Sequence, residues 1–357
     1  MSTNKTAGSS QQNRARVTAA EWFAGGRRVP YDPRSARVLT AEEAAATSDA
    51  LCVFERVAAA NEDDDAVWLT LLPGYPDGSY GWAQVDRILG DDLGPRLYVE
   101  PIGQGDSDKP QHYRYSTVER ADLINALWRH HGVRRTVVIS FDYTAMAVLE
   151  LLRRQLEAAT SGDTHLPVIV AALMVNGGLF ADAHTHPWWV TPLLRTPLGA
   201  QAMWFAQRYP GVFDASMRRA RLYARSYRPE RDELAELRSA ITRRDGAMFL
   251  HNAAGFVTEH RRHAHRWDLA AVAADLDENV ALYVGGSYED AYEHRQLTAA
   301  RERAPRAEFL TFPGGHLTTS EHPDLLAAGI IDIASHHGVG NGQLPADDKN
   351  PQSHAEQ

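Results

Sequence analysis

The chain has 357 residues, of which 44% are hydrophobic and 23% charged, and its formal net charge is −9. This length and composition are typical of one large or two ordinary globular domains with a sizeable buried core. The acidic balance argues against a nucleic-acid partner, because no net positive charge is available to neutralise phosphates. The one cysteine, Cys52, excludes an internal disulfide and a cysteine metal cluster.

The two ends of the chain differ in composition from the middle. Residues 1–14 are rich in Ser, Thr, Gln and Asn, and residues 338–357 in Gly, Asn, Asp and Gln, so both are predicted to be disordered tails. The polar start lacks the apolar centre of a secretory signal. The longest apolar run, residues 166–175, is too short to span a bilayer. We therefore expect a cytoplasmic protein with no membrane span.

Between these tails, strands and helices are predicted to alternate. The expected strands at residues 51–57 and 66–72 are separated by the acidic turn 61–65, which is typical of a hairpin loop. The elements expected next are a strand at 96–100, a helix at 117–131, a strand and helix around residue 142, and strands at 168–175, 280–284 and 307–312. Such alternation predicts a mostly parallel sheet with helices on both faces.

Residues 183–272 interrupt this alternation. They show helical periodicity, many arginines and aromatics, and no clear strand. We therefore predict an α/β core in two parts, residues 15–182 and 273–337, with residues 183–272 inserted as a helical lid.

Two groups of basic residues in the insert are interpreted as surface features. The arginine-rich stretch 218–231 is expected to be a solvated helical face, given the net acidity of the chain. His260, His263 and His265 are expected to form a solvated cluster on the lid, since neighbouring arginines would repel a metal ion.

Asp142 lies where an apolar, β-branched strand turns sharply into an apolar-periodic helix. A strand–turn–helix of this kind pushes one side chain out at the top of a sheet, beside backbone N–H groups. A carboxylate there can attack carbon and form an ester, which water must then cleave. The alternative is an aspartate that only caps the helix N-terminus, and the residues themselves leave both open.

Six short motifs occur in a fixed order along the chain. They lie at residues 22–31, 71–82, 103–110, 140–143, 176–180 and 315–323. On these motifs the chain resembles the α/β-hydrolases of the epoxide hydrolase and haloalkane dehalogenase branch, and within it most resembles the mesoderm-specific transcript-like proteins. The resemblance implies an α/β-hydrolase fold with a mostly parallel central sheet, helices on both faces and an inserted helical lid.

The resemblance also implies roles for single residues. Asp142 matches the nucleophile, and His316 matches the base that activates water against the ester. The backbone N–H groups of Tyr75 and Tyr143 match the donors that hold the oxyanion of this second step. No cofactor and no metal are implied.

The acid that orients His316 should follow the strand at 280–284. A strict alignment puts Tyr288 at this position, so we take Glu289 as the first choice and Asp290 as the second. Some dehalogenases carry the acid after the preceding strand instead, but that position here is the uncharged Asn176.

The lid is expected to contribute the aromatic residues that contact substrate. The candidates are Trp188, Trp189, Tyr209, Tyr223 and Tyr227. The tyrosines are included because epoxide hydrolases use two lid tyrosines to donate to the epoxide oxygen as it opens. An apolar, neutral small molecule is the expected substrate.

Four residues around the expected site depart from the family pattern. Pro73 and Phe141 replace histidines, Thr144 replaces a glycine, and Ala145 is a further change beside it. These departures indicate either an altered reaction or a lost one. A dehalogenase is disfavoured, because the positions that hold halide in that class are both tyrosine here.

The sequence therefore predicts a hydrolase of the epoxide hydrolase type that works through an ester on Asp142. Two alternatives stay open: a cofactor-free lyase, isomerase or cyclase of a biosynthetic pathway, and a catalytically inactive ligand-binding homologue. The expected partner is a small apolar molecule, with a homodimer possible and no nucleic acid.

Overall fold

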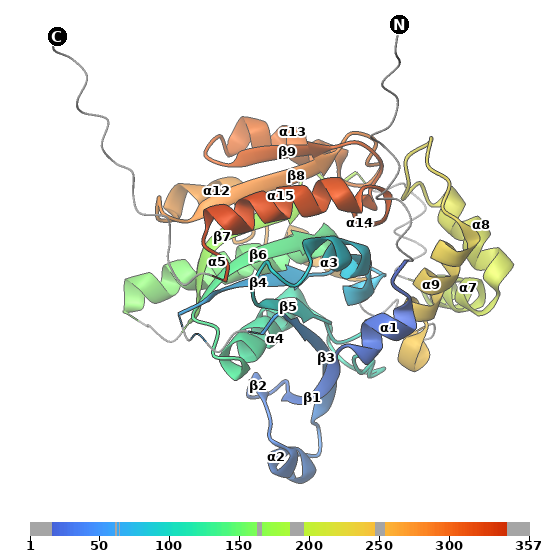
Figure 1. Cartoon of the computed structure of the whole chain (residues 1–357), viewed down its shortest axis with the longest axis horizontal. Coiled ribbons are helices and arrows are strands. Elements are labelled where there is room, and N and C mark those ends of the chain that lie inside the picture. The colour runs from blue at the N-terminus through green and yellow to red at the C-terminus, as the bar shows by residue number, and fades with distance from the viewer. Residues whose placement is uncertain are drawn as a thin grey trace, which may run out of the picture.

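Nine strands form a single sheet within the described residues, which are 16–60, 63, 65–162, 166–185, 196–246 and 254–340 of a computed structural model (Figure 1). The strand order is β2-β1-β3-β5-β4-β6-β7-β8-β9. Six neighbouring strands run parallel: β5 (Arg96–Val99), β4 (Val67–Leu72), β6 (Arg135–Phe141), β7 (Val168–Val175), β8 (Ala281–Ser287) and β9 (Glu308–Phe312). The prediction of a mostly parallel sheet is confirmed.

Three strands extend the sheet by antiparallel pairing: β1 (Arg27–Asp32), β2 (Arg37–Val38) and β3 (Leu51–Ala58). The predicted hairpin between β3 and β4 is wrong, because β5 lies between these two strands. Every residue of β4 is buried, which is typical of a central strand covered on both faces. β4 therefore lies in the middle of the sheet and not beside β3.

Helices of the core pack on both faces of the sheet (Figure 1). On one face α3 (Ala83–Leu89) contacts α15 (Pro323–His336), and on the other α4 (Thr117–His130) contacts α5 (Ala145–Ser161). The remaining core helices are α1 (Ala19–Ala24), α2 (Ala41–Ala46), α12 (Leu269–Asp275), α13 (His294–Arg303) and α14 (Thr318–Glu321), with short 3-10 turns η1 (Gly78–Trp82) and η2 (Asp142–Thr144). Helix α4 begins where predicted, because the Ser116 side chain accepts from the Glu119 N–H.

The insert gathers at one end of the sheet (Figure 1, yellow). Its described residues form α7 (Pro197–Arg208), α8 (Pro210–Arg219), α9 (Arg231–Ile241), the turn η3 (Arg243–Asp245) and α11 (Phe256–Arg262), and they contain no strand. The bounds of the lid, residues 183 and 272, stay a prediction. No helix in the described part of the chain has the length and apolarity needed to cross a membrane.

Two surface interpretations of the insert need correction. The arginines of the stretch 218–231 are exposed as expected, but the stretch is helical only at its ends, because α8 stops at Arg219 and α9 starts at Arg231. His260 is fully buried rather than solvated. Its Nδ1 lies 2.8 Å from Nε2 of His184, and its Nε2 lies 2.9 Å from the Trp267 carbonyl oxygen. His184 in turn lies 2.9 Å from the Glu293 carboxylate, so a buried chain of polar groups joins the insert to the core.

Candidate active site

Asp142 begins the turn that links β6 to α5, and its backbone is left-handed, with φ of 58°. This conformation is strained for a residue with a side chain, and such strain gathers at functional turns. Two glycines leave room for the turn. A Cβ on Gly74 would lie 2.5 Å from the Phe141 ring, and one on Gly177 would lie 2.8 Å from the Asp142 carbonyl oxygen. The turn is therefore held tightly between two neighbouring loops.

The Asp142 carboxylate uses its two oxygens differently. Oδ2 accepts a hydrogen bond of 2.9 Å from the backbone N–H of Tyr75, whereas Oδ1 lies 3.5 Å from Nε2 of His316. The side chain is thus held by the β4–η1 loop and does not act as a simple cap of its own helix. The carboxylate is only 7% exposed, so its charge is little screened by water.

Asp290, not Glu289, contacts His316. Both Asp290 carboxylate oxygens lie 3.1 Å from Nδ1 of His316, and Oδ1 also accepts from the Tyr292 N–H at 2.8 Å. Glu289 is exposed and accepts from the Arg225 N–H instead. The first choice made from the sequence is therefore wrong in geometry, and the second choice occupies the position. The Glu289 N–H donates to the Gly314 carbonyl, which sets the turn so that side chain 289 points out and side chain 290 points in.

Asn176, at the end of β7, positions the loop that carries His316. Its side-chain N–H group donates to the His316 carbonyl at 2.8 Å and to the Ser287 hydroxyl at 3.0 Å, while its Oδ1 accepts from the Ser287 N–H. Sequence reasoning considered this residue only as a missing acid. The Asn176 amide both donates, to the His316 carbonyl, and accepts, from the Ser287 N–H. An ionised carboxylate at this position could only accept.

The charge of His316 is set by competing effects. Burial alone would lower the pKa of its imidazole, but the carboxylates of Asp290 and Asp142 outweigh burial and raise the pKa well above its ordinary value. Asp77, in the same loop as Tyr75, is also buried, and burial followed by the charge of Asp142 raises the pKa of its carboxyl to about 7. Asp142 and Asp290 are therefore the two carboxylates in contact with His316 that favour its protonated form.

A cavity of about 760 Å³ opens above Asp142 and His316. The insert supplies most of its wall with apolar side chains, among them Met203, Ala206, Val212, Phe213, Met217 and Ile241. Such a cavity suits an apolar small molecule, because few polar groups need to be desolvated when it fills.

The tyrosines predicted from the lid do not border this cavity. Tyr209 is 49% exposed and packs against Phe205, and Tyr223 and Tyr227 line a different cavity. Trp188 and Trp189 lie outside the described residues.

Among the predicted site residues, Tyr75 does border the cavity over Asp142, and so do two residues that sequence reasoning missed, Tyr292 and Gln207. Neither gave a signal in the sequence. Which face of α7 presents Gln207 to the cavity is set by packing, and Tyr292 lies in an irregular turn.

The departures from the family pattern are accommodated by local packing. The Phe141 ring lies 5.4 Å from the His316 ring, so an apolar contact replaces a polar neighbour. The Thr144 hydroxyl donates to the Phe141 carbonyl at 2.8 Å, which satisfies it in the buried turn. The methyl group of Ala145 fits because the residue facing it is Gly177. The turn keeps its shape in spite of these changes.

One group of potential metal ligands occurs in the described residues. Glu55, His130 and His131 bring ligand atoms within 4.8 Å of one another. Arg27 donates to Glu55 at 2.9 Å and lies 3.2 Å from His130. A guanidinium thus stands where a cation would bind, and none of these residues borders the cavity over Asp142.

Comparison with known proteins fits this arrangement of sheet, turn and histidine loop. The model of the alpha/beta hydrolase family matches residues 71–329, which is more than half of the chain. The chain belongs to the alpha/beta hydrolase family. The mesoderm-specific transcript homolog proteins of Bos taurus and Homo sapiens are each 27% identical over 201 residues, covering 56% of this chain and 58% of the relative. The match thus spans a little over half the length of these curated relatives.

Other proteins match this chain over a larger share of their length. The putative hydrolase LipZ of Mycobacterium tuberculosis is 26% identical over 272 residues, covering 75% of this chain and 88% of that protein. Among solved structures, the epoxide hydrolase CorEH has a TM-score of 0.57 at 16% identity, covering 80% of this chain and 95% of CorEH. The haloalkane dehalogenase DbeA of Bradyrhizobium elkani has a TM-score of 0.60 at 17% identity, covering 80% and 94%. At these identities the structures support the fold alone.

The Asp142 turn generates a test of its packing. We expect Gly177→Ala to lower the free energy of unfolding by about 1–3 kcal/mol, because the new methyl group would lie 2.4 Å from the Ala145 Cβ. The matched control is Gly211→Ala in α8, where nothing lies within 4 Å of the added Cβ. Urea unfolding measures both variants. Equal stabilities would contradict the close packing described here.

The contact between Asp290 and His316 generates a second test. We expect Asp290→Asn to lower the pKa of His316, because one of the two anions that hold its proton is removed. Glu289→Gln is the matched control and should leave that pKa in place, since Glu289 faces Arg225. NMR titration of the imidazole measures the pKa, with His316→Gln assigning the resonance. A larger effect from Glu289→Gln would overturn the assignment of Asp290.

Proposed function

We propose that this chain is a hydrolase that forms a covalent ester between Asp142 and an apolar small molecule, an epoxide in the first instance, and cleaves it with water activated by His316. The observation that carries the proposal is the arrangement of Asp142, His316 and Asp290 in one buried row beneath an apolar cavity. A buried carboxylate beside an orientable imidazole is the pairing that nucleophilic catalysis with a second, hydrolytic step requires.

In the first step, Oδ1 of Asp142 attacks a carbon of the substrate. Its other oxygen is held by the Tyr75 N–H, so Oδ1 is the oxygen that faces the cavity side and His316. A new C–O bond forms, and the epoxide C–O bond breaks. The oxygen released takes the proton that His316 holds, which leaves the imidazole neutral, and the Gln207 side chain borders the cavity as a further polar group.

In the second step, His316 changes from a cation to a base. Esterification removes the negative charge of Asp142, so only Asp290 still favours the proton on the imidazole while burial opposes it. The pKa of His316 therefore falls when the ester forms. The neutral imidazole takes a proton from water, the hydroxide attacks the ester carbonyl carbon, and the N–H groups of Tyr75 and Tyr143 stabilise the oxyanion. Breaking the ester frees the diol and leaves one water oxygen in the carboxylate.

A second candidate function is a cofactor-free lyase, isomerase or cyclase. It is favoured by the finding that Tyr209, Tyr223 and Tyr227 do not border the cavity over Asp142, since these were the expected donors to an epoxide oxygen. The Phe141 contact with His316 also makes the surroundings of the imidazole more apolar than the family pattern implies. In this case Asp142 and His316 would move a proton without forming an ester.

Trapping the ester tests the proposed function. We expect His316→Gln to accumulate a protein adduct with the mass of one styrene oxide molecule, because attack by Asp142 still occurs while water is no longer activated. Wild type should show the adduct only transiently, and Asp142→Asn should show none. Intact-protein mass spectrometry measures the adduct, with digestion placing it on Asp142.

Other outcomes of the trapping experiment separate the alternatives. A 1-haloalkane and an aryl ester are run beside styrene oxide, in ¹⁸O-labelled water. Conversion without adduct and without incorporation of label would favour the cofactor-free reaction. No adduct and no conversion with any of the three would reject the hydrolase and favour a ligand-binding homologue.

The pH dependence of ester cleavage gives a further prediction. The imidazole must be neutral to act as a base, so the single-turnover rate of cleavage should be low at acidic pH and rise to a plateau. Because the Asp142 charge is absent in the ester, the half-maximal rate should lie at a lower pH than the pKa of His316 in the free protein. Rapid quench across pH, compared with NMR titration, measures both. A rate that falls with rising pH would contradict the role of His316.

A further inference from the structure

A second cavity, of about 1130 Å³, shares two segments with the cavity over Asp142. Along residues 218–228, Ala220 and Leu222 border the first cavity, while Arg221 and Tyr223 border the second. Along the turn after β8, Tyr292 borders the first cavity and Asp290 the second. The Tyr292 hydroxyl donates to the Ala220 carbonyl at 2.5 Å, which ties the two segments together. We call the second cavity the arginine pocket.

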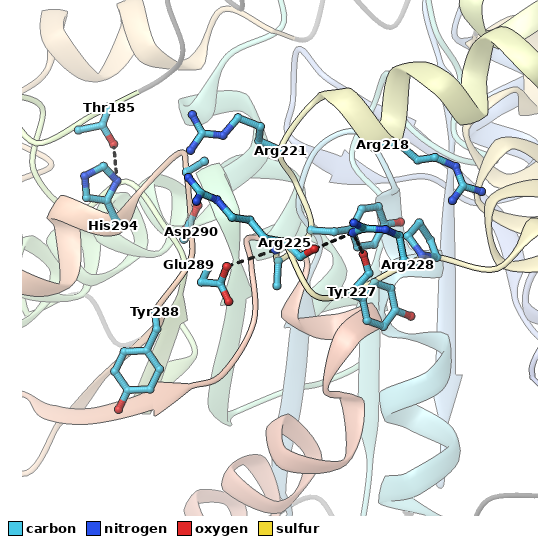
Figure 2. A pocket seen from close by; sticks show the side chains of 14 residues that line it. Thr185, Arg218, Arg221, Arg225, Tyr227, Arg228, Tyr288, Glu289, Asp290 and His294 are labelled. Atoms are coloured by element: carbon cyan, nitrogen blue, oxygen red, sulfur yellow. Dashed lines mark hydrogen bonds between the residues drawn. The ribbon is translucent and has the colours of Figure 1, made fainter.

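Four arginines line this pocket: Arg218, Arg221, Arg225 and Arg228 (Figure 2). In the described part of the chain, no carboxylate lies within 4.0 Å of any of their guanidinium nitrogens. Arg228 instead donates to the carbonyls of Arg225 and Tyr227, which fixes its direction.

Two carboxylates also line the pocket. Glu289 accepts from the Arg225 backbone N–H, and Asp290 faces His316. The four guanidinium groups have no carboxylate partner among the described residues, and their side chains are exposed. They are therefore open to an anion from solvent, which would gain charge-assisted hydrogen bonds by binding among them.

Tyr223 also lines the arginine pocket. Its side chain is 9% exposed and stacks on Tyr227 with ring centroids 5.4 Å apart. The hydroxyl oxygen is closed off from solvent, so Tyr223 borders the pocket through its other atoms. Arg221 also has a left-handed backbone, with φ of 59°, a strain that a binding site can use.

We propose that the arginine pocket binds a phosphate-bearing anion. The planar fork of each guanidinium matches the oxygens of a phosphoryl group, and several such groups together suit a ligand that carries more than one negative charge. The volume of the pocket accommodates a small phosphorylated molecule or a diphosphate.

Binding in the arginine pocket should reach the active site through Asp290. This consequence rests on the proposed function, whereas binding itself does not. A bound anion adds negative charge beside Asp290 and so near His316. This charge favours the protonated imidazole and raises the pKa of His316. Ester cleavage should therefore shift to higher pH when the pocket is filled.

Calorimetric titration of the full chain with inorganic pyrophosphate tests the binding. We expect one site whose affinity falls with added salt, and a loss of about tenfold or more in the double variant Arg221→Gln/Arg225→Gln. Tyr223→Phe keeps the ring stack and should bind as wild type does, because the buried hydroxyl does not reach the pocket. The matched control is Arg231→Gln, an exposed arginine of α9 that does not line the pocket and should bind as wild type does.

The outcomes distinguish specific binding in the arginine pocket from non-specific attraction of anions to the surface. No binding of pyrophosphate, or equal binding by the wild type and by the double variant with an unchanged unfolding midpoint, overturns the proposal. Citrate bound as tightly as pyrophosphate overturns the phosphate assignment. Pelleting with vesicles that contain phosphatidic acid, lost in the double variant, would identify a lipid headgroup as the source of the phosphate, while pyrophosphate binding without pelleting identifies a free phosphorylated ligand.

Discussion

The imidazole of His316 lies between the carboxylates of Asp290 and Asp142, and the rest of the site depends on these two contacts. Burial disfavours the charged imidazole, so the proton stays only while both anions are close. Four neighbouring strands keep them close, because β6 ends just before Asp142, β7 before Asn176, β8 before Asp290 and β9 before His316. Since the carboxyl ends of parallel strands meet at one edge of the sheet, residues far apart in sequence converge there.

The parts of this arrangement that depend on local sequence could be predicted. Asp142 was identifiable because an apolar strand, a sharp turn and an apolar helix lie within a short stretch, and His316 because it follows a strand and a glycine-rich turn. The order of the strands could not be predicted in full. The pairing of β3 with β5 rather than with β4 depends on contacts between distant segments, which a turn composition at 61–65 does not encode.

The residue that contacts His316 and the residues of the cavity wall could not be predicted either, because both depend on contacts between distant segments. Whether residue 289 or 290 faces His316 depends on a one-residue change of direction after β8, set by a backbone hydrogen bond from Glu289 to Gly314. The cavity wall depends on how α7 and α8 lie over the core, so Gln207 and Tyr292 were missed while exposed Tyr209 was chosen. The aromatic residues of the insert indicate a covered site, but the packing of the helices decides which of them face the cavity.

The chain of Glu293, His184 and His260 has a consequence for how the insert can move. Burial and the neighbouring His184 lower the pKa of His260 to about 4, so this ring is neutral. Its Nε2 must donate to the Trp267 carbonyl, which leaves Nδ1 to accept from His184 and requires a proton between His184 and Glu293. Pulling α11 away would leave Nε2 of His184 and Nδ1 of His260 without one another, while Glu293 would keep its contact with His184. Because both rings would lose a buried hydrogen bond, we expect α11 to stay fixed to the core when a ligand enters.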